Sequence, residues 1–493
     1  NVLELIQYHA ASLKGKDPLH PGLLACVTGM GGSFGIDSLT DVNLNCAAIS
    51  GIIKTADKEW GNVTCRSIDV DFSTVENDKL GVTIANELMF TGPLETGLIN
   101  HQCYEIELPS LPVSANAIEI EQQLRPGETV VISGGARGIT AEIAIELARH
   151  YKVNLLLLGR SALPEKEPGW LINLNDEKSI KQALVDNNNE SLNPKSIESK
   201  YQQLLATREI IDTLLRIEKE GVIVKYQSVD IRDKAEVDKY VDEARKEMGL
   251  VTGIVHGAGV ISDKFIIDKS TEQFNNVFST KVDGLNALLA ATEDDNLKIL
   301  VMFSSSTGRF GRKGQCDYAA ANEVLNKIAQ HQSRLRPDCR VLSMNWGPWD
   351  GGMVTPQLRK LFEKEGVGVI PLKAGSRHLV KELNASGSVE IVILGSEPVI
   401  QNNAKESTTY NQNIPTPNNN MHVAFERMIN IKDFPVLNSH VMNGKAVLPA
   451  ALILEWFTNG AMHNNPGLVF KGIKDLRIFK GVILDSDSQI NIQ

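Results

Sequence analysis

Three polar residues in the middle of the chain have the types and spacing of a group that handles a proton at a carbonyl. Tyr318 lies 13 residues after Ser305, and Asn322 lies four residues after Tyr318. Tyr318 and Asn322 therefore share one face of a predicted helix. A tyrosine hydroxyl can protonate the alkoxide that develops as hydride reaches a ketone, and a serine hydroxyl can hold the carbonyl oxygen.

A tyrosine acid of this kind needs a charged neighbour. The pKa of a free tyrosine is about 10, and a nearby ammonium lowers it by stabilising the phenolate. Lys281, which lies 24 residues before Ser305, is the candidate for that role. The competing interpretation is a core tyrosine on a helix after a serine-rich turn, and it would be the better one if Tyr318 stood alone.

A glycine-rich turn supplies the residue types for a nucleotide site. Residues 133–140 read Ser-Gly-Gly-Ala-Arg-Gly-Ile-Thr between an apolar run and a helical pattern. Glycines at such a turn let the backbone approach a pyrophosphate at the N-terminus of a helix. A tight turn between a strand and a helix, without any ligand, is the alternative.

The residue after the next predicted strand indicates which dinucleotide would bind. An acidic residue there would bind the 2′-hydroxyl of NAD, whereas Arg160 offers a fork of donors to a 2′-phosphate, so we predict NADPH. Arg137 in the turn adds a second positive charge or faces solvent. Asp230 is placed to meet the adenine, and residues 257–259 make room for the adenosine. The predicted cofactor contacts are Ser133, Gly134, Gly135, Arg137, Gly138, Ile139, Arg160, Asp230, Ile231, Gly257, Ala258 and Gly259.

Short apolar runs that alternate with helical segments predict the elements that position these groups. Continuously apolar runs, joined by connections long enough for helices, are typical of a parallel sheet buried on both faces. We predict an α/β fold with a Rossmann-like, doubly wound parallel sheet. The connection of about 60 residues between the second and third runs predicts an inserted helical element, a solvated surface decoration rather than a site. The runs lie at 129–133, 154–158, 222–226, 251–256, 298–303, 340–345 and 389–394.

Length and composition favour a soluble multidomain protein. The chain has 493 residues, of which 42% are hydrophobic and 22% are charged. Its net charge of −10 argues against a nucleic-acid partner, because a phosphate backbone requires clustered lysine and arginine. The six scattered cysteines show no Cys-x-x-Cys pair, so we expect reduced thiols and no metal site. No apolar run approaches the ~20 residues of a membrane span, and we expect a cytoplasmic fragment of a longer protein, with no membrane partner.

The polar residues together resemble a known family. Lys281, Ser305, Tyr318 and Asn322 are similar to the active site of the ketoreductase domains of modular polyketide synthases and animal-type fatty acid synthases, in which Lys and Asn exchange places relative to stand-alone short-chain dehydrogenases. The stretch 345–353 resembles the family's loop beside the nicotinamide. The resemblance covers residues 126–400 and implies a catalytic NADPH-binding Rossmann domain.

The sequence departs from the family's pattern at one position, and other features favour one branch of the family. Thr140 stands where the family usually carries a third glycine, which puts tight packing at the helix start in question. The sequence of residues 134–140 and the long insertion look similar to those of the ketoreductase of bacterial polyunsaturated fatty acid synthases. The implied reaction is reduction of a β-ketoacyl thioester, carried by acyl carrier protein, to the β-hydroxyacyl thioester. The implied partners are that carrier protein and other domains of the same synthase, and a homodimer of the full-length protein stays open.

The chain before the Rossmann domain resembles a second part of the same family. Residues 1–125, especially around Glu59-Trp60, are similar to the truncated, non-catalytic structural subdomain. A second glycine-rich stretch, Gly29 to Gly35, reads like another nucleotide loop, but no ribose partner and no tyrosine set follow it. Residues 401–420 are rich in Asn, Thr and Pro and are predicted to be a linker.

The last part, residues 421–493, resembles the N-terminal part of a dehydratase-like hot-dog domain. His440, Gly444 and Pro449 match that family's His-x-x-x-Gly-x-x-x-x-Pro motif, and an apolar helix-like stretch runs from Val447 to Phe457. His440 is thus a candidate dehydratase residue. The resemblance implies that its partner carboxylate comes from a second hot-dog unit. Asp485 and Asp487 lie downstream, but in a polar turn-like run. We expect no dehydration by this segment alone.

Stereochemistry and two rival functions complete the prediction. Ile261-Ser262-Asp263 occupies the place of the family's Leu-Asp-Asp signature, and Phe310 replaces the Trp of the opposite class, which implies a D (3R) product. The rivals are a non-catalytic scaffold module of such a synthase and a free-standing short-chain alcohol dehydrogenase. The complete Lys, Ser, Tyr and Asn set argues against the scaffold module, and the flanking segments argue against the free-standing enzyme.

Overall fold

The computed structural model describes two compact units, Asn1–Val399 and Ile400–Gln493, and each is considered by itself. The described residues are 2–15, 22–37, 42–74, 77–89, 92–100, 102–109, 124–163, 167–187, 193–351, 359–360, 362, 364, 367–395, 427–431, 434–442, 444–462, 472, 482–484 and 490–492. The predicted linker at 401–420, Met353, Asp485 and Asp487 lie outside this set.

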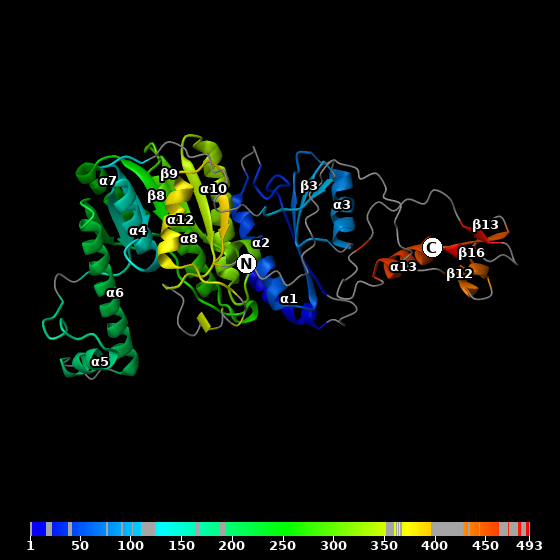
Figure 1. Cartoon of the computed structure of the whole chain (residues 1–493). Helices are drawn as coiled ribbons and strands as arrows, with labels where there is room; N and C mark the ends of the chain where they lie inside the picture. The colour runs from blue at the N-terminus through cyan, green and yellow to red at the C-terminus, as the bar shows by residue number, and fades with distance from the viewer. Residues whose placement is uncertain are drawn as a thin grey trace. The chain divides into compact units, whose positions relative to one another are not determined.

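A seven-stranded, all-parallel sheet forms the centre of the first unit (Figure 1). The strand order is β11-β10-β9-β8-β5-β6-β7, so the chain starts in the interior of the sheet and winds outward in both directions. This order confirms the predicted doubly wound Rossmann-like sheet. The strands are β5 (Thr129–Ser133), β6 (Asn154–Gly159), β7 (Val224–Ser228), β8 (Val251–His256), β9 (Ile299–Ser305), β10 (Arg340–Trp346) and β11 (Glu390–Ile393).

Helices cover both faces of this sheet, which explains why its strands are continuously apolar. In β5, Val131 packs into one core, and its neighbours Val130 and Ile132 pack into the other. The first core lies under α7 (Lys234–Met248), α8 (Thr271–Ala291) and α10 (Cys316–Leu335). The second lies under α4 (Gly138–Tyr151), α6 (Pro194–Glu218) and α12 (Leu372–Leu383).

The strand order reverses beside β5, because the chain proceeds to β6 on one side and later to β8 on the other. In open parallel sheets the carboxyl ends of the strands at such a point form the ligand crevice. Ser133, Gly257 and Ser305 lie at the carboxyl ends of β5, β8 and β9. The topology therefore brings the glycine turn and the serine-rich turn to the same edge of the sheet.

The long connection between β6 and β7 is helical, as predicted. It contains α5 (Glu177–Asp186) and α6, and both helices begin at an N-cap side chain, Asp176 and Asn193 respectively. The first half of α6 packs with α5 around a small core of its own. The second half contributes Ile210 and Ile217 to the core against α4. The insertion is thus partly integrated into the main domain.

Residues before the Rossmann domain form a second, smaller sheet in the order β1-β2-β3-β4, with only β4 antiparallel. Helix α2 packs between this sheet and α10, and its core includes Cys316 and Ala320 of α10. The elements are α1 (Val2–Lys14), β1 (Gly22–Thr28), η1 (Leu44–Cys46), α2 (Ala47–Glu59), β2 (Val63–Val70), α3 (Asn77–Met89), β3 (Glu95–Ile99) and β4 (Gln102–Tyr104).

The second unit contains short strands and one helix. Its elements are β12 (Arg427–Ile429), η3 (Pro435–Asn438), β13 (Val441–Met442), β14 (Lys445–Val447), α13 (Ala450–Met462), β15 (Ile483–Leu484) and β16 (Ile490–Ile492). The helix was expected from Val447, but Val447 pairs with Ile483 in an antiparallel ladder and the helix begins after Pro449. The hot-dog assignment of this segment stays a prediction.

Candidate active site

The glycine turn after β5 has no space for a side chain at its first glycine, Gly134. Gly134 has φ +71°, and a Cβ there would lie 3.1 Å from the backbone of Gly257 and Ala258. Gly138, the first residue of α4, has φ +59°. Only glycine adopts such a conformation freely, so the sequence allows the backbone to form a narrow cradle at the start of α4.

Thr140 is accommodated by the glycine that directly follows the neighbouring strand β8. The Thr140 side chain is buried, and a Cβ on Gly257 would lie 2.6 Å from both its Oγ1 and its Cγ2. The glycine expected at position 140 is therefore replaced by room at position 257. This pairing removes the doubt that the sequence raised about packing at the helix start.

Arg137 is engaged by the insertion. Its Nε donates to Oε2 of Glu209 at 2.9 Å, and the backbone N–H of Gly138 donates to Oε1 of the same carboxylate at 2.7 Å. Glu209 lies on α6, within the element that was expected to be a solvated decoration. The helical insertion thus reaches the glycine turn, which its sequence did not indicate.

Arg160 and Asp230 lie near one another at the ends of β6 and β7. Arg160 is exposed directly after β6, and its positive charge contributes to the lowered pKa of Asp230. The larger cause is Arg232, whose Nε donates to the Asp230 carboxylate at 2.9 Å. Ile231, which lies between Asp230 and Arg232 in the sequence, is buried. Arg160 remains available to an anionic ligand at this edge, while the Asp230 carboxylate is already paired.

The serine, tyrosine and asparagine predicted to act together lie on β9 and α10. Ser305 is the last residue of β9 and the N-cap of α9 (Ser306–Phe310), where its Oγ accepts from Thr307 N at 3.1 Å. Tyr318 and Asn322 are one turn apart in α10, and Asn322 Nδ2 donates to the Tyr318 carbonyl at 2.8 Å. Asn322 is fully buried, whereas Tyr318 is half-buried.

Lys281 of α8 lies over the face of the tyrosine. Its Nζ is 5.3 Å from the Tyr318 ring centroid and donates to the Phe303 carbonyl at 2.8 Å. Burial lowers the pKa of Lys281 to about 7. It also raises the pKa of Tyr318 to about 12, although a hydrogen bond from Asn322 acts in the opposite direction. The tyrosine pKa was expected to be lowered; burial instead dominates in the chain without a ligand, because it disfavours charge on both groups.

His256 was missed by the sequence reasoning. It is the last residue of β8 and is fully buried between the glycine turn and α8. Its Nδ1 lies 2.8 Å from Ser133 Oγ, and its Nε2 lies 2.8 Å from the Lys281 carbonyl. Burial lowers the pKa of His256 to about 3, so the ring is neutral and Nε2–H donates to the carbonyl, which cannot donate.

The resulting hydrogen bonds run in one direction. Ala258 N donates to Ser133 Oγ at 3.2 Å, Ser133 donates to His256, and His256 donates to the Lys281 backbone. The cofactor turn and Lys281 are thereby tied through buried side chains. A histidine that ends an apolar strand directly before Gly-Ala-Gly was the only signal in the sequence.

A second polar cluster lies beside Tyr318. Gln315 Nε2 donates to Asp263 at 3.1 Å, and its Oε1 accepts from Thr307 Oγ1 at 3.1 Å. The negative charge of Asp263 contributes to the raised pKa of Tyr318. Ile261 and Phe310, the other residues singled out for stereochemistry, are 41% and 43% exposed. They leave an apolar surface available near the polar cluster.

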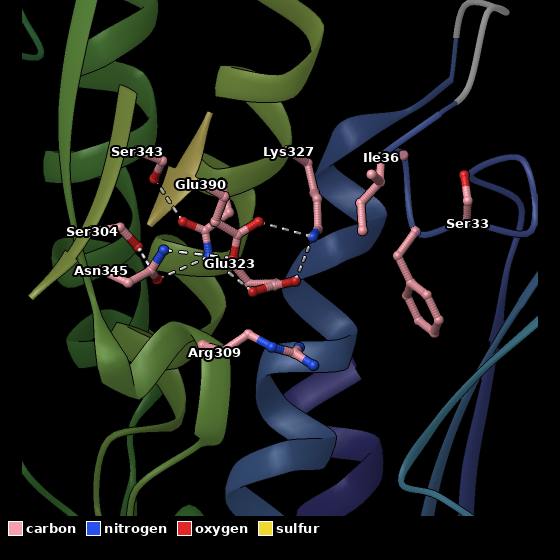
Figure 2. A network of polar contacts seen from close by, with 12 residues as sticks. Ser33, Ile36, Ser304, Arg309, Glu323, Lys327, Ser343, Asn345 and Glu390 are labelled. Carbon is pink, nitrogen blue, oxygen red and sulfur yellow. Dashed lines mark hydrogen bonds and ion pairs between the residues drawn. The ribbon is translucent and has the colours of Figure 1, made fainter. Parts of the chain in front are cut away.

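A buried ion-pair network surrounds Glu323 and Lys327 of α10 (Figure 2). Lys54 of α2 lies 3.2 Å from both Glu95 and Glu323, and Lys327 lies 3.1 Å from Glu323. Burial alone would raise the pKa of Glu323, but the surrounding cations lower it below its usual range. The members are three carboxylates and three cations: Glu95, Glu323, Glu390, Lys54, Arg309 and Lys327.

Uncharged side chains extend this network to the end of β9. Ser304 Oγ donates to Asn345 Oδ1 at 3.0 Å and lies 3.1 Å from the Asn322 carbonyl. Asn326 donates to Asn345 and accepts from Ser343 at 2.6 Å. Figure 2 shows this chain of contacts next to Glu323 and Lys327. The strand that carries Ser305 and the helix that carries Tyr318 are thus joined by buried hydrogen bonds.

Helix α2, which packs on the smaller sheet, also hydrogen-bonds to two segments that flank the site. Glu59, at the end of α2, accepts from Ile266 N and from Gly314 N, both at 2.9 Å. Ile266 lies in η2 (Ile266–Asp268), and Gly314 lies directly before α10. Gly51 of α2 approaches α10 so closely that a Cβ would lie 2.6 Å from Ala320 N.

The second glycine-rich stretch is closed by the protein itself. The buried Asp69 carboxylate accepts from Thr28 Oγ1 and Met30 N at 2.7 Å and from Phe34 N at 2.8 Å. Met30 and Phe34 are fully buried as well. An internal carboxylate thus satisfies backbone N–H groups of this loop.

In the second unit His440 is exposed, and its Nδ1 lies 2.8 Å from the Val447 carbonyl across the hairpin. Gly444 has φ +78°, which suits the turn between β13 and β14. Over the described residues of both units, no group of three or more His, Cys, Asp or Glu side chains could hold a metal ion. Within that same set, no helix is both long and apolar enough to span a bilayer.

Comparison with known proteins shows which family model and which solved structures the chain matches. Residues 128–351 match the model of the KR domain family. The ketoreductase from the first module of phoslactomycin biosynthesis in Streptomyces sp. HK803 superposes with a TM-score of 0.61 at 22% identity, over 80% of this chain and 79% of that chain. A ketoreductase domain from the bacillaene assembly line gives a TM-score of 0.59 at 21% identity, over 80% and 81%. These likenesses show a shared fold.

Sequence relatives extend the match beyond the Rossmann domain. One subunit of the polyunsaturated fatty acid synthase of Thraustochytrium sp. (strain ATCC 26185 / S-3) is 33% identical over 483 residues, which is 93% of this chain. Polyketide synthase PksN of Bacillus subtilis (strain 168) is 27% identical over 372 residues, or 72% of this chain. The chain spans 16% of the first relative's length and 6% of the second's.

Proposed function

Because residues 128–351 match the model of the KR domain family, we propose that the chain reduces a β-ketoacyl thioester to the β-hydroxyacyl thioester with NADPH. The observation that carries the proposal is the placement of Lys281 over the Tyr318 ring, with Asn322 one turn further along α10. Ser305 lies at the same edge of the sheet as the glycine turn. The proposed substrate is held by an acyl carrier protein within a multidomain synthase, in line with the relatives of the chain.

The residues present fit a dinucleotide. The cradle has no space for a side chain at Gly134, has φ +59° at Gly138, and presents backbone N–H groups at the start of α4. Arg160 and Arg137 would hold a 2′-phosphate, and Asp230 with Ile231 would border the adenine. The other proposed contacts are Ser133, Gly135, Ile139, Gly257, Ala258 and Gly259. NADPH, when bound, supplies the hydride.

The side chains of the chain then handle the carbonyl oxygen. The Ser305 hydroxyl donates to that oxygen and stabilises the charge that develops on it. The Tyr318 hydroxyl gives its proton to the same oxygen. A pKa raised to about 12 keeps that proton on the tyrosine at neutral pH, so the residue starts the reaction as an acid. Lys281 and Asn322 position the ring, and a charged Lys281 would stabilise the phenolate afterwards.

We further propose a D (3R) product. The support is Asp263 at the last position of the family's signature and Phe310 in place of the opposite class's tryptophan, both close to the turn that leads into α10. Chiral analysis of the hydroxyacyl product tests this assignment. A mainly L product would overturn it and leave the reduction itself intact.

The decisive experiment follows NADPH oxidation with two substrates, a β-ketoacyl thioester and a small ketone. We expect the thioester to be reduced with the larger kcat/KM. Absence of turnover with both would favour the non-catalytic scaffold module, and a preference for the small ketone would favour the free-standing alcohol dehydrogenase.

Tyr318→Phe removes the proton donor alone. The expected result is a loss of kcat of about two orders of magnitude or more, with NADPH binding largely kept. Tyr201→Phe, on the insertion helix α6, is the matched control and should leave kcat unchanged. Unchanged turnover in Tyr318→Phe would contradict the assignment of this tyrosine.

A further inference from the structure

The insertion helix α6 delivers a carboxylate to the proposed phosphate cradle. Glu209 accepts from Gly138 N at 2.7 Å and from Arg137 Nε at 2.9 Å. Arg137 is the N-cap residue of α4, and no side-chain hydrogen bond from it caps the helix. Glu209 therefore performs two functions of a bound phosphate, since it satisfies a backbone donor at the positive end of α4 and pairs with the arginine of the turn.

The contact can open without moving α6. Glu209 and Arg137 are 42% and 48% exposed, so water can replace each of them. Further along α6, Arg216 holds Glu142 of α4 with two hydrogen bonds at 2.6 and 2.9 Å. Ile210, next to Glu209, is buried in the core against α4. A rotation of the Glu209 side chain alone is enough to free the cradle.

We infer that Glu209 is an internal competitor that occupies the phosphate end of the cofactor site and sets the affinity for NADPH. This inference rests on the proposed function. The phosphates of NADPH cannot use the Gly138 N–H and the Arg137 guanidinium while the Glu209 carboxylate occupies both, and like charges repel at that distance. Apparent affinity falls by the fraction of molecules in which the carboxylate is in place. The insertion thus acts on the site from outside the Rossmann core.

The test measures the NADPH Kd and the melting temperature of three proteins: the wild type, Glu209→Gln and Asp212→Asn. Asp212 is the matched control, because it lies on the same helix, is 67% exposed and makes no contact with the glycine turn among the described residues. We expect Glu209→Gln to bind NADPH at least about three-fold more tightly, because a neutral amide holds the cradle less strongly and does not repel a phosphate. Its melting temperature without ligand should be lower, because the two hydrogen bonds lose the charge that strengthens them. Asp212→Asn should change neither quantity.

Each outcome decides the inference. Weaker or unchanged NADPH binding by Glu209→Gln would overturn it, with weaker binding meaning that Glu209 positions Arg137 for the cofactor. An equal gain in Asp212→Asn would also overturn it, since the effect would then come from net charge alone. Lack of NADPH binding by the wild type would instead remove the proposed function itself. Glu209→Ala, whose side chain cannot hydrogen-bond at all, should show at least the gain of Glu209→Gln.

Discussion

Two buried lysines near α10 show how differently a single residue type can be used. Lys269 forms an ion pair with Asp317 at 2.7 Å, with both side chains inaccessible to solvent. Among the described residues, Lys281 Nζ hydrogen-bonds to the Phe303 carbonyl alone and lies over the Tyr318 ring, and burial lowers its pKa to about 7. The first lysine is part of the fold, whereas the second is a charge kept at a cost to stability because the proposed reaction uses it.

Lys281→Met should therefore stabilise the protein while it abolishes reduction. At pH 7 we expect an increase of about 2 kcal/mol in the free energy of unfolding, because the buried amine is replaced by an apolar side chain. The folded-state pKa of about 7 lies below the ordinary lysine value of 10.5, so between these pH values the unfolded chain binds the extra proton and the wild type gains stability as pH rises. The advantage of Lys281→Met should accordingly shrink from pH 7 to pH 10.

Urea denaturation at the two pH values measures this difference. Lys269→Met is the control and should be destabilised by about 3 kcal/mol, because it leaves Asp317 buried without its cation. A Lys281→Met variant less stable than the wild type at pH 7 would mean that the lysine is held by interactions stronger than its burial cost.

Arg160→Ala should separate the two nicotinamide cofactors. Its guanidinium is proposed to bind the 2′-phosphate, which NADH lacks, so we expect the Kd for NADPH to rise about ten-fold or more and that for NADH to change little. Fluorescence titration with both cofactors measures the two constants. Arg149→Ala, an exposed arginine near the other end of α4, serves as the control. Equal losses for NADPH and NADH would refute the assigned contact.

At the scale of elements, helix α10 is held by close packing and by buried charge together. Gly51 of α2 lies directly against the backbone of Ala319 and Ala320, next to Tyr318. On the following turns, Glu323 and Lys327 face Lys54 and Glu390. The charges fix the rotation of α10 about its axis, because each buried group requires its partner.

Gly51→Ala should disturb this arrangement. The new Cβ would lie 2.6 Å from Ala320 N and 2.7 Å from the Ala319 carbonyl, so α2 and α10 must separate. We expect a loss of about 2 kcal/mol in stability and a lower kcat, because the displaced helix carries Tyr318. Gly81→Ala in α3, where no atom lies within 4 Å of the new Cβ, should stabilise by about 0.5 kcal/mol. Thermal melts and NADPH oxidation give both readouts, and a fully active, fully stable Gly51→Ala would show that the interface yields without consequence.

At the scale of the whole molecule, the two sheets of the first unit share part of one hydrophobic core. Cys316 and Ala320 of α10 belong to the core of the smaller sheet, and Glu59 holds loops on both flanks of the proposed site. The boundary proposed near residue 125 therefore separates two sheets that fold around common side chains. We expect the smaller sheet to be needed for activity, although none of the contacts described for its residues reaches the proposed reacting atoms.

The second unit is predicted to add no chemistry to the reduction. His440 is exposed and, among the described residues of this unit, hydrogen-bonds to Val447 and to no carboxylate that would complete an acid and base pair. With NADPH and a β-ketoacyl thioester, the product should be the hydroxyacyl thioester alone, as mass spectrometry of the thioester pool would show. His440→Ala should give the same product at the same rate. Enoyl thioester that disappears in His440→Ala would establish dehydration by this segment.

The sequence by itself determined the features that depend on near neighbours. Strand and helix order follow from local apolar runs, the shared face of Tyr318 and Asn322 follows from their four-residue spacing, and the cradle follows from glycines that adopt positive φ without strain. The doubly wound sheet followed from those local patterns. The family resemblance then assigned roles to residues whose contacts no pattern could give.

Only the tertiary structure decided which distant groups meet. His256 and Lys281 are 25 residues apart, Gly138 and Glu209 are 71 apart, and Glu59 and Gly314 are 255 apart. Such contacts leave no periodic trace in a sequence, because a single carboxylate or imidazole looks the same whether it is solvated or buried. Burial decides its charge, and only the fold sets burial: it raises the pKa of Tyr318, lowers that of Lys281 and keeps His256 neutral.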